Sequence, residues 1–197
     1  MSVAIVASGG ANVASLQFAL QRLGRAAEVT ADSTRIRDAS HVILPGVGAA
    51  ADAMQRLKRL KLDALLPTLQ QPVLGVCLGM QLLFEGSDEG DTACLGIMSG
   101  RATRIPNAAG RPVPHMGWNT LRIRQPHALL EGVEPGGHAY FVHSYALKVG
   151  TTTLASCEYG ADFSACVACR NFYGTQFHPE RSASLGAKLL ANFLRLN

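Results

Sequence analysis

Strand and helix patterns alternate along the first half of the chain, and this alternation limits the possible fold more than any other feature. Short apolar runs typical of strands buried on both faces lie at 3–7, 41–44 and 73–76, with a weaker strand pattern at 26–30. Helical patterns lie between them, at 13–23, 49–60 and 62–69. Strands separated by helices join a parallel sheet through right-handed crossovers. The sequence therefore predicts an α/β fold of three layers, in which helices flank a mixed, mostly parallel central sheet.

The pattern changes after residue 84. Short strand-like segments, broken by proline and glycine, follow at 102–105, 120–123, 138–143, 153–156, 163–169 and 173–176. Their close spacing favours antiparallel pairing, and residues 185–193 have the apolar spacing of a closing helix. No internal repeat or linker separates the two halves, so we expect residues 1–197 to form a single domain with a smaller antiparallel part.

Composition excludes several other classes of protein. Hydrophobic residues make up 48% of the chain and charged residues only 16%, which is typical of a globular protein and argues against disorder or a coiled coil. No run approaches the ~20 consecutive apolar residues of a membrane span. The short apolar N-terminus lacks the basic leader of a signal peptide. We therefore expect a cytoplasmic protein that does not bind membranes.

The charge of the chain disfavours nucleic-acid binding. The net charge is only +4 and aromatic residues make up 6%, which gives few positions for stacking on bases. A basic cluster at Arg56, Lys58, Arg59 and Lys61 fits the solvated face of a helix, although it could also bind phosphates or a partner. No base-reading motif accompanies this cluster.

The cysteines indicate neither a disulfide framework nor a metal site. The chain has 5 cysteines, an odd number that is natural for reduced thiols in the cytoplasm. Cys166 and Cys169 form a C-x-x-C pair, but no second pair supplies the remaining ligands of a zinc site. A redox dithiol would open a helix, whereas this pair lies in a strand-like segment. We expect two buried, inert cysteines, and no metal or cofactor.

The segment Gly75-Val76-Cys77-Leu78-Gly79 carries the clearest chemical signal. It lies where a buried strand ends and a helix begins, and its two glycines permit a sharp turn at Cys77. This is the nucleophile-elbow pattern G-x-S-x-G with cysteine in place of serine. The helix N-terminus favours a thiolate, and the N–H of Leu78 can donate to an oxyanion. A buried structural cysteine is the alternative.

A cysteine nucleophile needs a histidine base, and the base needs an orienting group. Among the 6 histidines, His178 is best placed, because it follows the predicted strand at 173–176 and Glu180 lies two residues further on. In an extended segment the two side chains point to the same side, so the carboxylate can fix the imidazole tautomer. A surface His–Glu pair is the alternative.

Two glycine-containing turns follow other predicted strands. Pro45-Gly-Val-Gly48 ends the strand at 41–44 and leaves N–H groups free to face an anion. In a parallel sheet this segment lies at the same edge as Cys77, so the N–H of Val47 could be the second oxyanion donor; an ordinary strand-exit turn is the equal alternative. The first turn, Ser8-Gly-Gly-Ala-Asn12, lacks the glycine pattern of a dinucleotide site and is read as a tight turn.

Together these motifs resemble the class I, triad-type glutamine amidotransferases, and the resemblance covers nearly the whole chain. The narrower resemblance is to the glutaminase subunits of imidazole glycerol phosphate synthases, which act in histidine biosynthesis. The strings that match are Pro45-Gly-Val-Gly48, Gly75-Val-Cys-Leu-Gly-Met-Gln-Leu-Leu-Phe-Glu85, Pro114-His-Met-Gly-Trp-Asn119, Tyr140-Phe-Val-His-Ser-Tyr145 and Gln176-Phe-His-Pro-Glu-Arg-Ser182. The elbow and the His-x-Glu are shared by the whole class, whereas the third and fourth strings are more particular.

The resemblance implies a role for each matching residue. Cys77 would be the nucleophile, His178 the general base and then acid, and Glu180 its orienting group in the hydrolysis of L-glutamine to glutamate and ammonia. The positions that match those holding glutamine are Gly48, Gln81, Glu89, Ser144 and Tyr145. The positions that match the face meeting a (βα)₈ cyclase subunit, as a heterodimer, are Asn12, Trp118, Asn119, Tyr140 and Arg181. The first turn departs from the family pattern, and Arg181 stands where lysine is common.

Two other functions stay open on the sequence alone. One is an amidotransferase subunit for a different acceptor, such as chorismate, against which the Trp118-Asn119 string argues. The other is a non-catalytic, ligand-binding relative, which would be favoured if a triad residue were missing. Co-purification with a (βα)₈ partner would decide the first alternative.

Overall fold

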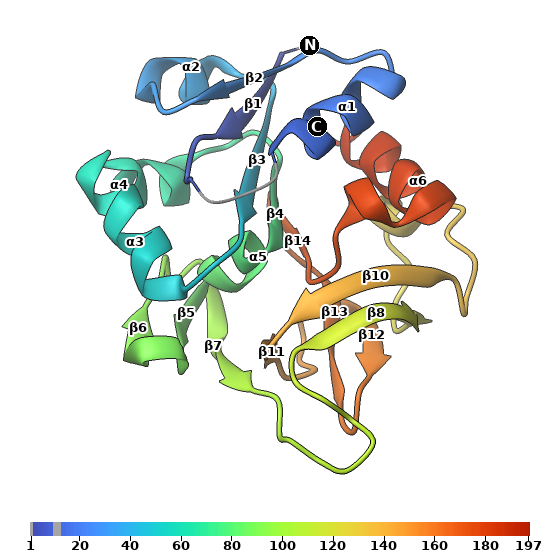
Figure 1. Cartoon of the computed structure of the whole chain (residues 1–197). Coiled ribbons are helices and arrows are strands. Elements are labelled where there is room, and N and C mark those ends of the chain that lie inside the picture. The colour runs from blue at the N-terminus through green and yellow to red at the C-terminus, as the bar shows by residue number, and fades with distance from the viewer. Residues whose placement is uncertain (1, 10–12) are drawn as a thin grey trace.

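An eight-stranded central sheet organises residues 2–9 and 13–197, the part of the chain that the computed structural model describes (Figure 1). Its strand order is β2-β1-β3-β4-β14-β13-β12-β9. The bounds are β1 Val3–Val6, β2 Ala27–Thr30, β3 His41–Gly46, β4 Val73–Cys77, β9 Arg122–Ile123, β12 Thr153–Glu158, β13 Asp162–Cys169 and β14 Phe172–Thr175. Neighbours from β2 to β14 pair in parallel, and β13, β12 and β9 add antiparallel pairs. The predicted mixed, mostly parallel sheet is confirmed.

The parallel strands are buried on both faces, as their apolar runs predict. Alternate residues of β1 enter different cores, with Ile5 on one side of the sheet and Val6 on the other. The same alternation continues in β3, where Ile43 and Leu44 are both fully buried. Helices must therefore cover both faces of this half of the sheet.

Helices on the two faces complete the predicted three layers (Figure 1). One face is covered by α1 (Val13–Arg22) and α6 (Ala183–Phe193), which contribute Leu20 and Leu189 to the core there. The other face is covered by α2 (Ser33–Asp38), α3 (Ala50–Arg59), α4 (Leu62–Leu65) and α5 (Leu78–Leu82). Short 3₁₀ helices occupy Leu66–Thr68, Glu89–Asp91, Ala128–Leu130 and Pro179–Arg181.

Two smaller sheets lie beside the carboxyl ends of the parallel strands. An antiparallel ribbon joins β8 (His115–Thr120) to β10 (His138–His143). A second sheet has the order β11-β7-β5-β6, with bounds Tyr145–Leu147, Met98–Arg104, Phe84–Ser87 and Thr92–Ala93. The chain passes from the ribbon to this sheet between His143 and Tyr145, so residues on both sides of the passage are held by paired strands.

The structure differs from the sequence prediction in particular segments. The predicted helix at 62–69 is a single turn of α4 followed by a 3₁₀ turn, because Pro67 lies within it and cannot donate a backbone hydrogen bond. The predicted strand at 120–123 is divided at Leu121, whose backbone pairs instead with Gly136 and Gly137. Five further elements, α2, β5, β6, β8 (except Thr120) and β11, were not predicted, and none is longer than six residues.

Cys166 and Cys169 lie on opposite faces of β13, because Cys166 enters one core and Cys169 packs against the other. They cannot form the dithiol of a redox site in this arrangement. Cys166 is buried as expected, whereas Cys169 is only partly buried. Among residues 2–9 and 13–197, no group of three or more metal-ligating side chains comes together. No helix in those ranges is long and apolar enough to span a membrane.

Candidate active site

Cys77 occupies a sharp turn between β4 and α5. It is the last residue of β4, and its backbone angles of φ 54° and ψ −114° lie outside the regions that ordinary residues prefer. The helix α5 begins at the next residue, Leu78. Strained backbone of this kind is found at functional sites, where the surrounding structure holds it in place. The nucleophile-elbow geometry expected from the motif is present.

The two elbow glycines are required by close backbone packing. A Cβ atom on Gly79 would lie 1.8 Å from the carbonyl oxygen of Leu44, and one on Gly75 would lie 2.6 Å from the carbonyl oxygen of Gly79. Neither position therefore admits a side chain. This packing brings the first turn of α5 against β3 and places Cys77 at the carboxyl edge of the sheet.

The sulfur of Cys77 has two polar neighbours. Its Sγ lies 3.7 Å from the carbonyl oxygen of Val142, at the end of β10. The side-chain amide nitrogen of Gln176 lies 3.8 Å from the same Sγ. The Gln176 amide therefore directs a hydrogen-bond donor at the sulfur, and the Val142 carbonyl presents an acceptor to it.

His178 and Glu180 form a buried pair. Nδ1 of His178 lies 2.9 Å from Oε1 of Glu180, and the two side chains are 9% and 8% exposed. The surface-pair alternative is therefore wrong. The backbone N–H of His178 donates to the carbonyl of Tyr140, and its own carbonyl accepts from the Ser182 hydroxyl. These bonds hold the imidazole between the sheet and the ribbon.

The free ring nitrogen of His178 is available for proton transfer. Nε2 is buried and makes no regular hydrogen bond with the residues the structure describes. Burial lowers the pKa of His178, but interactions with Cys77 and Glu180 outweigh burial and raise that pKa from 6.5 to about 10. The imidazolium is therefore the stable form at neutral pH, and it lies beside Cys77 in the same cavity. A histidine beside the cysteine is the arrangement that a Cys–His nucleophile requires.

A cavity of about 360 Å³ opens in front of this pair. All five residues expected to hold glutamine line it, together with both expected oxyanion donors. Its walls are Val47, Gly48, Cys77, Leu78, Gln81, Glu89, Pro114, Val142, His143, Ser144, Tyr145 and His178. The cavity is thus lined by several separate stretches of sequence, which include both candidate reactive side chains, Cys77 and His178.

Hydrogen bonds fix several of these walls. A carboxylate oxygen of Glu89 accepts from the first backbone N–H of α3, at Ala50, over 2.8 Å. The amide nitrogen of Gln81 donates to the carbonyl of Tyr145 and to Oε1 of Gln176, both over 2.9 Å. The Ser8 hydroxyl donates to the carbonyl of Pro45 over 2.8 Å and so supports the segment that contains Val47.

The residues expected at a partner surface divide between the two faces of the ribbon. Tyr140 contacts Trp118 edge to face, with ring centroids 5.9 Å apart, and the Arg181 guanidinium lies 4.6 Å from the Tyr140 ring centre. We call Trp118, Tyr140 and Arg181 the outer cluster; Trp118 is 53% exposed. Asn119 instead points to the inner face, where its side chain bonds to other parts of the chain. The expected interface residue Asn12 lies outside the described residues.

Sequence reasoning missed four groups at the cavity or beside the sulfur of Cys77. Gln176 lies in a matching string, but its position just after a predicted strand gave no sign of contact with Cys77. The carbonyl of Val142 and the ring of His143 reach the cavity because the chain changes sheets after β10. Pro114, the first residue of another matching string, also lines the cavity. Only the matching strings themselves could have drawn attention to these positions.

Comparison with known proteins shows the family of this chain. The glutamine amidotransferase class-I family matches residues 5–196. A protein of Mannheimia succiniciproducens named imidazole glycerol phosphate synthase subunit HisH is 48% identical, over 96% of this chain and 97% of that protein. The protein of the same name from Vibrio cholerae is 45% identical, over 99% of this chain and 98% of that protein.

Solved structures share the fold at lower sequence identity. A protein described as a glutamine amidotransferase aligns with 98% of this chain and 96% of its own, at a TM-score of 0.75 and 21% identity. A glutamine amidotransferase from Thermotoga maritima aligns over the same shares, at a TM-score of 0.72 and 14% identity. The fold, the cysteine elbow and the sequence identity agree, and the chain belongs to the class I glutamine amidotransferase family, among the HisH subunits of imidazole glycerol phosphate synthase.

Proposed function

We propose that Cys77, His178 and Glu180 hydrolyse the side-chain amide of L-glutamine, and that the ammonia passes to the cyclase subunit of imidazole glycerol phosphate synthase. The observation that carries this proposal is the buried His178–Glu180 pair, whose free Nε2 shares a cavity with Cys77. A cysteine, a histidine and an orienting carboxylate are the parts of a nucleophilic triad.

The first half of the reaction forms a thioester. The Cys77 thiolate attacks the amide carbon of glutamine, and the carbonyl oxygen becomes an oxyanion. The backbone N–H groups of Leu78 and Val47 stabilise that charge, each donor contributing on the order of 10²–10³ in rate. The His178 imidazolium gives its Nε2 proton to the amide nitrogen. The carbon–nitrogen bond then breaks, ammonia leaves, and a γ-glutamyl thioester remains on Cys77.

The second half of the reaction releases glutamate. Neutral His178 takes a proton from water, and the resulting hydroxide attacks the thioester carbon. The carbon–sulfur bond breaks, and Cys77 returns as a thiolate beside the imidazolium. Glutamate leaves with a γ-carboxylic acid group, which then gives its proton to the solvent. Glu180 keeps Nδ1–H of His178 directed away from the sulfur throughout, so Nε2 stays the reactive nitrogen.

The cavity offers groups suited to glutamine. Glu89 supplies a carboxylate for the α-amino group, and its other contact with the α3 N-terminus holds that carboxylate in place. The segment containing Ser144 and Tyr145 lines the same cavity, as do Gln81 and Gly48. A site of about 360 Å³ is at the small end of the range usual for small-molecule pockets, which suits an amino acid.

We further propose that the outer cluster meets the (βα)₈ cyclase subunit in the cytoplasm. An exposed Trp next to a Tyr and an Arg is the composition of an interface hot spot. The HisH relatives are named as subunits, which supports a permanent partner. The glycines on either side of Val47 let that peptide rotate at low cost, so docking could aim its N–H at the oxyanion.

Steady-state glutaminase kinetics test the proposed function. They are measured on the free chain, on its complex with the cyclase from the same source, and on that complex with the cyclase's nucleotide ligand. We expect slow hydrolysis by the free chain and a rise in kcat on complex formation that far exceeds the change in KM. Full activity of the free chain would indicate a stand-alone glutaminase. Co-purification with a different (βα)₈ enzyme would indicate another acceptor.

A further inference from the structure

Three side chains form a continuous hydrogen-bonded line from the ribbon to the cavity. The amide nitrogen of Asn119 lies 3.2 Å from Nε2 of His115. Nδ1 of His115 lies 3.0 Å from Nε2 of His143. Nδ1 of His143 lies 2.8 Å from the carbonyl oxygen of Tyr145, which lines the cavity. We call Asn119, His115 and His143 the relay.

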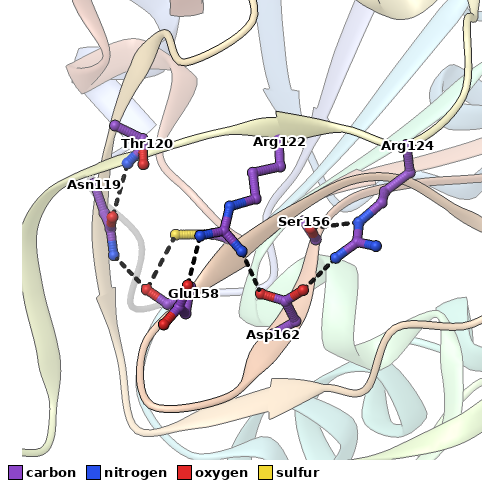
Figure 2. A network of polar contacts seen from close by, with 8 residues as sticks. Asn119, Thr120, Arg122, Arg124, Ser156, Glu158 and Asp162 are labelled. Atoms are coloured by element: carbon purple, nitrogen blue, oxygen red, sulfur yellow. Dashed lines mark hydrogen bonds and ion pairs between the residues drawn. The ribbon is translucent and has the colours of Figure 1, made fainter.

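The orientation of Asn119 is fixed by two backbone groups (Figure 2). Its Oδ1 accepts from the backbone N–H of Thr120 over 2.8 Å, and its amide nitrogen donates to the carbonyl of Glu158 over 2.9 Å. A backbone N–H can only donate and a backbone carbonyl can only accept. The amide nitrogen therefore faces His115, and Nε2 of His115 must accept.

The other end of the relay is fixed in the same way. The Tyr145 carbonyl can only accept, so Nδ1 of His143 carries a proton and its Nε2 accepts from His115. Both imidazoles are then neutral Nδ1–H tautomers, and every bond points from Asn119 towards Tyr145. Burial agrees with neutral rings, because it lowers the pKa of His115 to about 4 and that of His143 to about 3.

The relay ends on a carbonyl that organises the substrate cavity. The Tyr145 oxygen accepts from both His143 and Gln81. It lies where the chain leaves β10 and enters β11, next to Ser144 and close to the Val142 carbonyl that approaches Cys77. If His143 turned a bare nitrogen towards this oxygen, two acceptors would face each other, and the segment would have to move.

We propose that Asn119 and His115 are positioning residues for glutamine binding, which act by holding His143 as the tautomer that donates to the Tyr145 carbonyl. The inference rests on the proposed glutaminase function. It also assigns Asn119 to the inner side of the ribbon, separate from the outer cluster.

The surroundings of the relay keep it rigid. The His115 ring is stacked between Phe141 and Tyr159, with ring centroids 4.9 Å and 4.0 Å away. Glu158, whose carbonyl holds Asn119, belongs to a network of ion pairs at the edge of the central sheet (Figure 2). In that network Arg122 pairs with Glu158 and Asp162, and Arg124 pairs with Asp162.

Two substitutions of Asn119 distinguish a role in fixing the His143 tautomer from a merely structural role. Asn119→Asp keeps the shape of the side chain and the acceptor for the Thr120 N–H. It presents an acceptor oxygen to His115, so Nε2 of His115 would have to donate instead of accept. Asn119→Leu removes the hydrogen bonds of the side chain and places neither a donor nor an acceptor opposite His115. A structural role predicts that the leucine variant is the more damaging, whereas the relay predicts that the aspartate variant is. Thr120→Val is the matched control, because its exposed side chain lies outside the relay and its backbone N–H is retained.

The readouts are glutaminase kinetics of the cyclase complex and ¹⁵N NMR of the histidine tautomers in the free chain. We expect Asn119→Asp to raise KM for glutamine roughly tenfold, equivalent to about 1.4 kcal/mol, with a smaller change in kcat. His143 should be an Nδ1–H tautomer in the wild type and the Thr120→Val control, and should shift towards Nε2–H in Asn119→Asp. A wild-type KM in Asn119→Asp, or an Nε2–H tautomer at His143 in the wild type, would overturn the relay. If the wild-type complex releases no glutamate, the proposed function fails, and the wild-type tautomer still decides the relay.

Discussion

Gly46 and Cys77 are register partners in the parallel pair β3–β4. The strand end that precedes Val47 therefore lies beside the strand end that carries the candidate nucleophile. Because both strands point the same way, their exits share one edge of the sheet, as the sequence predicts for two parallel strands. The proposed oxyanion donors and the sulfur are thus placed by the central sheet and do not depend on a long loop.

Chemical labelling should single out Cys77. We expect Cys77→Ala to lower glutamate release by several orders of magnitude, as loss of a triad nucleophile does. A glutamine-like electrophile should label Cys77 in the wild type, because Cys77 lines the proposed glutamine cavity together with His178. Burial raises the pKa of Cys157 and Cys166 to about 12 and that of Cys94 to about 11, so these thiols should react slowly. Peptide mass spectrometry measures the distribution, and equal labelling of Cys94 would contradict the assignment.

Removal of the Glu180 charge should lower the pKa of His178. In the wild type the interactions with Cys77 and Glu180 raise that pKa to about 10 against the effect of burial. A folded-state pKa above the unfolded value stabilises the protein below about pH 6.5, and this contribution is lost as the pH rises to about 10. Glu180→Gln should therefore show a smaller loss of stability between these values. NMR titration of His178 and urea unfolding at several pH values measure the effect, and an unchanged pKa would exclude a role for the Glu180 charge.

Variants of His178 and Glu180 should lose activity to different extents. His178→Asn should be nearly as inactive as Cys77→Ala, because His178 Nε2 is the buried, unpartnered ring nitrogen of the cavity in the part of the chain that the structure describes. Glu180→Gln should be milder, since the backbone bonds to Tyr140 and Ser182 still hold the ring. Glutamate release in the cyclase complex measures both variants. Inactivity of His143→Asn together with an active His178→Asn would show that the base is wrongly assigned.

The elbow glycine should be essential for the fold. A methyl group on Gly79 would overlap the Leu44 carbonyl at 1.8 Å, so we expect Gly79→Ala to lower the free energy of unfolding by about 3 kcal/mol or more. Gly150→Ala is the control, because no atom lies within 4 Å of the added carbon. It should change stability by less than about 1 kcal/mol. Urea denaturation of both variants gives the comparison, and equal effects would contradict the close approach.

Truncation in the outer cluster should weaken activation by the cyclase. We expect Trp118→Ala to cost at least about 2 kcal/mol of binding, as truncation of a central interface Trp does, while Cys77 stays open to labelling. Val29→Ala is the control, because Val29 is an exposed apolar residue on β2, at the far edge of the central sheet. Titration calorimetry with the cyclase measures affinity. Equal affinities of the two variants would place the interface elsewhere.

The sequence predicts the site better than it predicts its surroundings. The apolar runs that become β1, β3 and β4 and the glycines around Cys77 locate the elbow, because burial and backbone clashes leave few alternatives there. His178 and Glu180 are two residues apart, so their contact needs only an extended local backbone. The family resemblance also predicted glutamine-binding candidates that line one cavity.

What the sequence did not reveal depends on contacts between distant segments. Gln176 reaches Cys77 only because β14 pairs with β4. In the extended strand β8, successive side chains point to opposite faces, so Asn119 faces inward while Trp118 faces outward. The sequence analysis did not predict this strand, so it could not assign a face to Asn119. The short strands β5, β6 and β11 are defined by their partners in the small sheet, since segments of this length carry little pattern of their own.

The most direct test of the proposed chemistry is detection of the acyl intermediate on Cys77. The cyclase complex is mixed with glutamine, quenched in acid within one turnover, digested, and analysed by peptide mass spectrometry. We expect a γ-glutamyl group on the peptide containing Cys77, absent in Cys77→Ala and formed more slowly in His178→Asn. Glutamate release at the full wild-type rate without any acylated Cys77, or acylation of a different cysteine, would contradict the account.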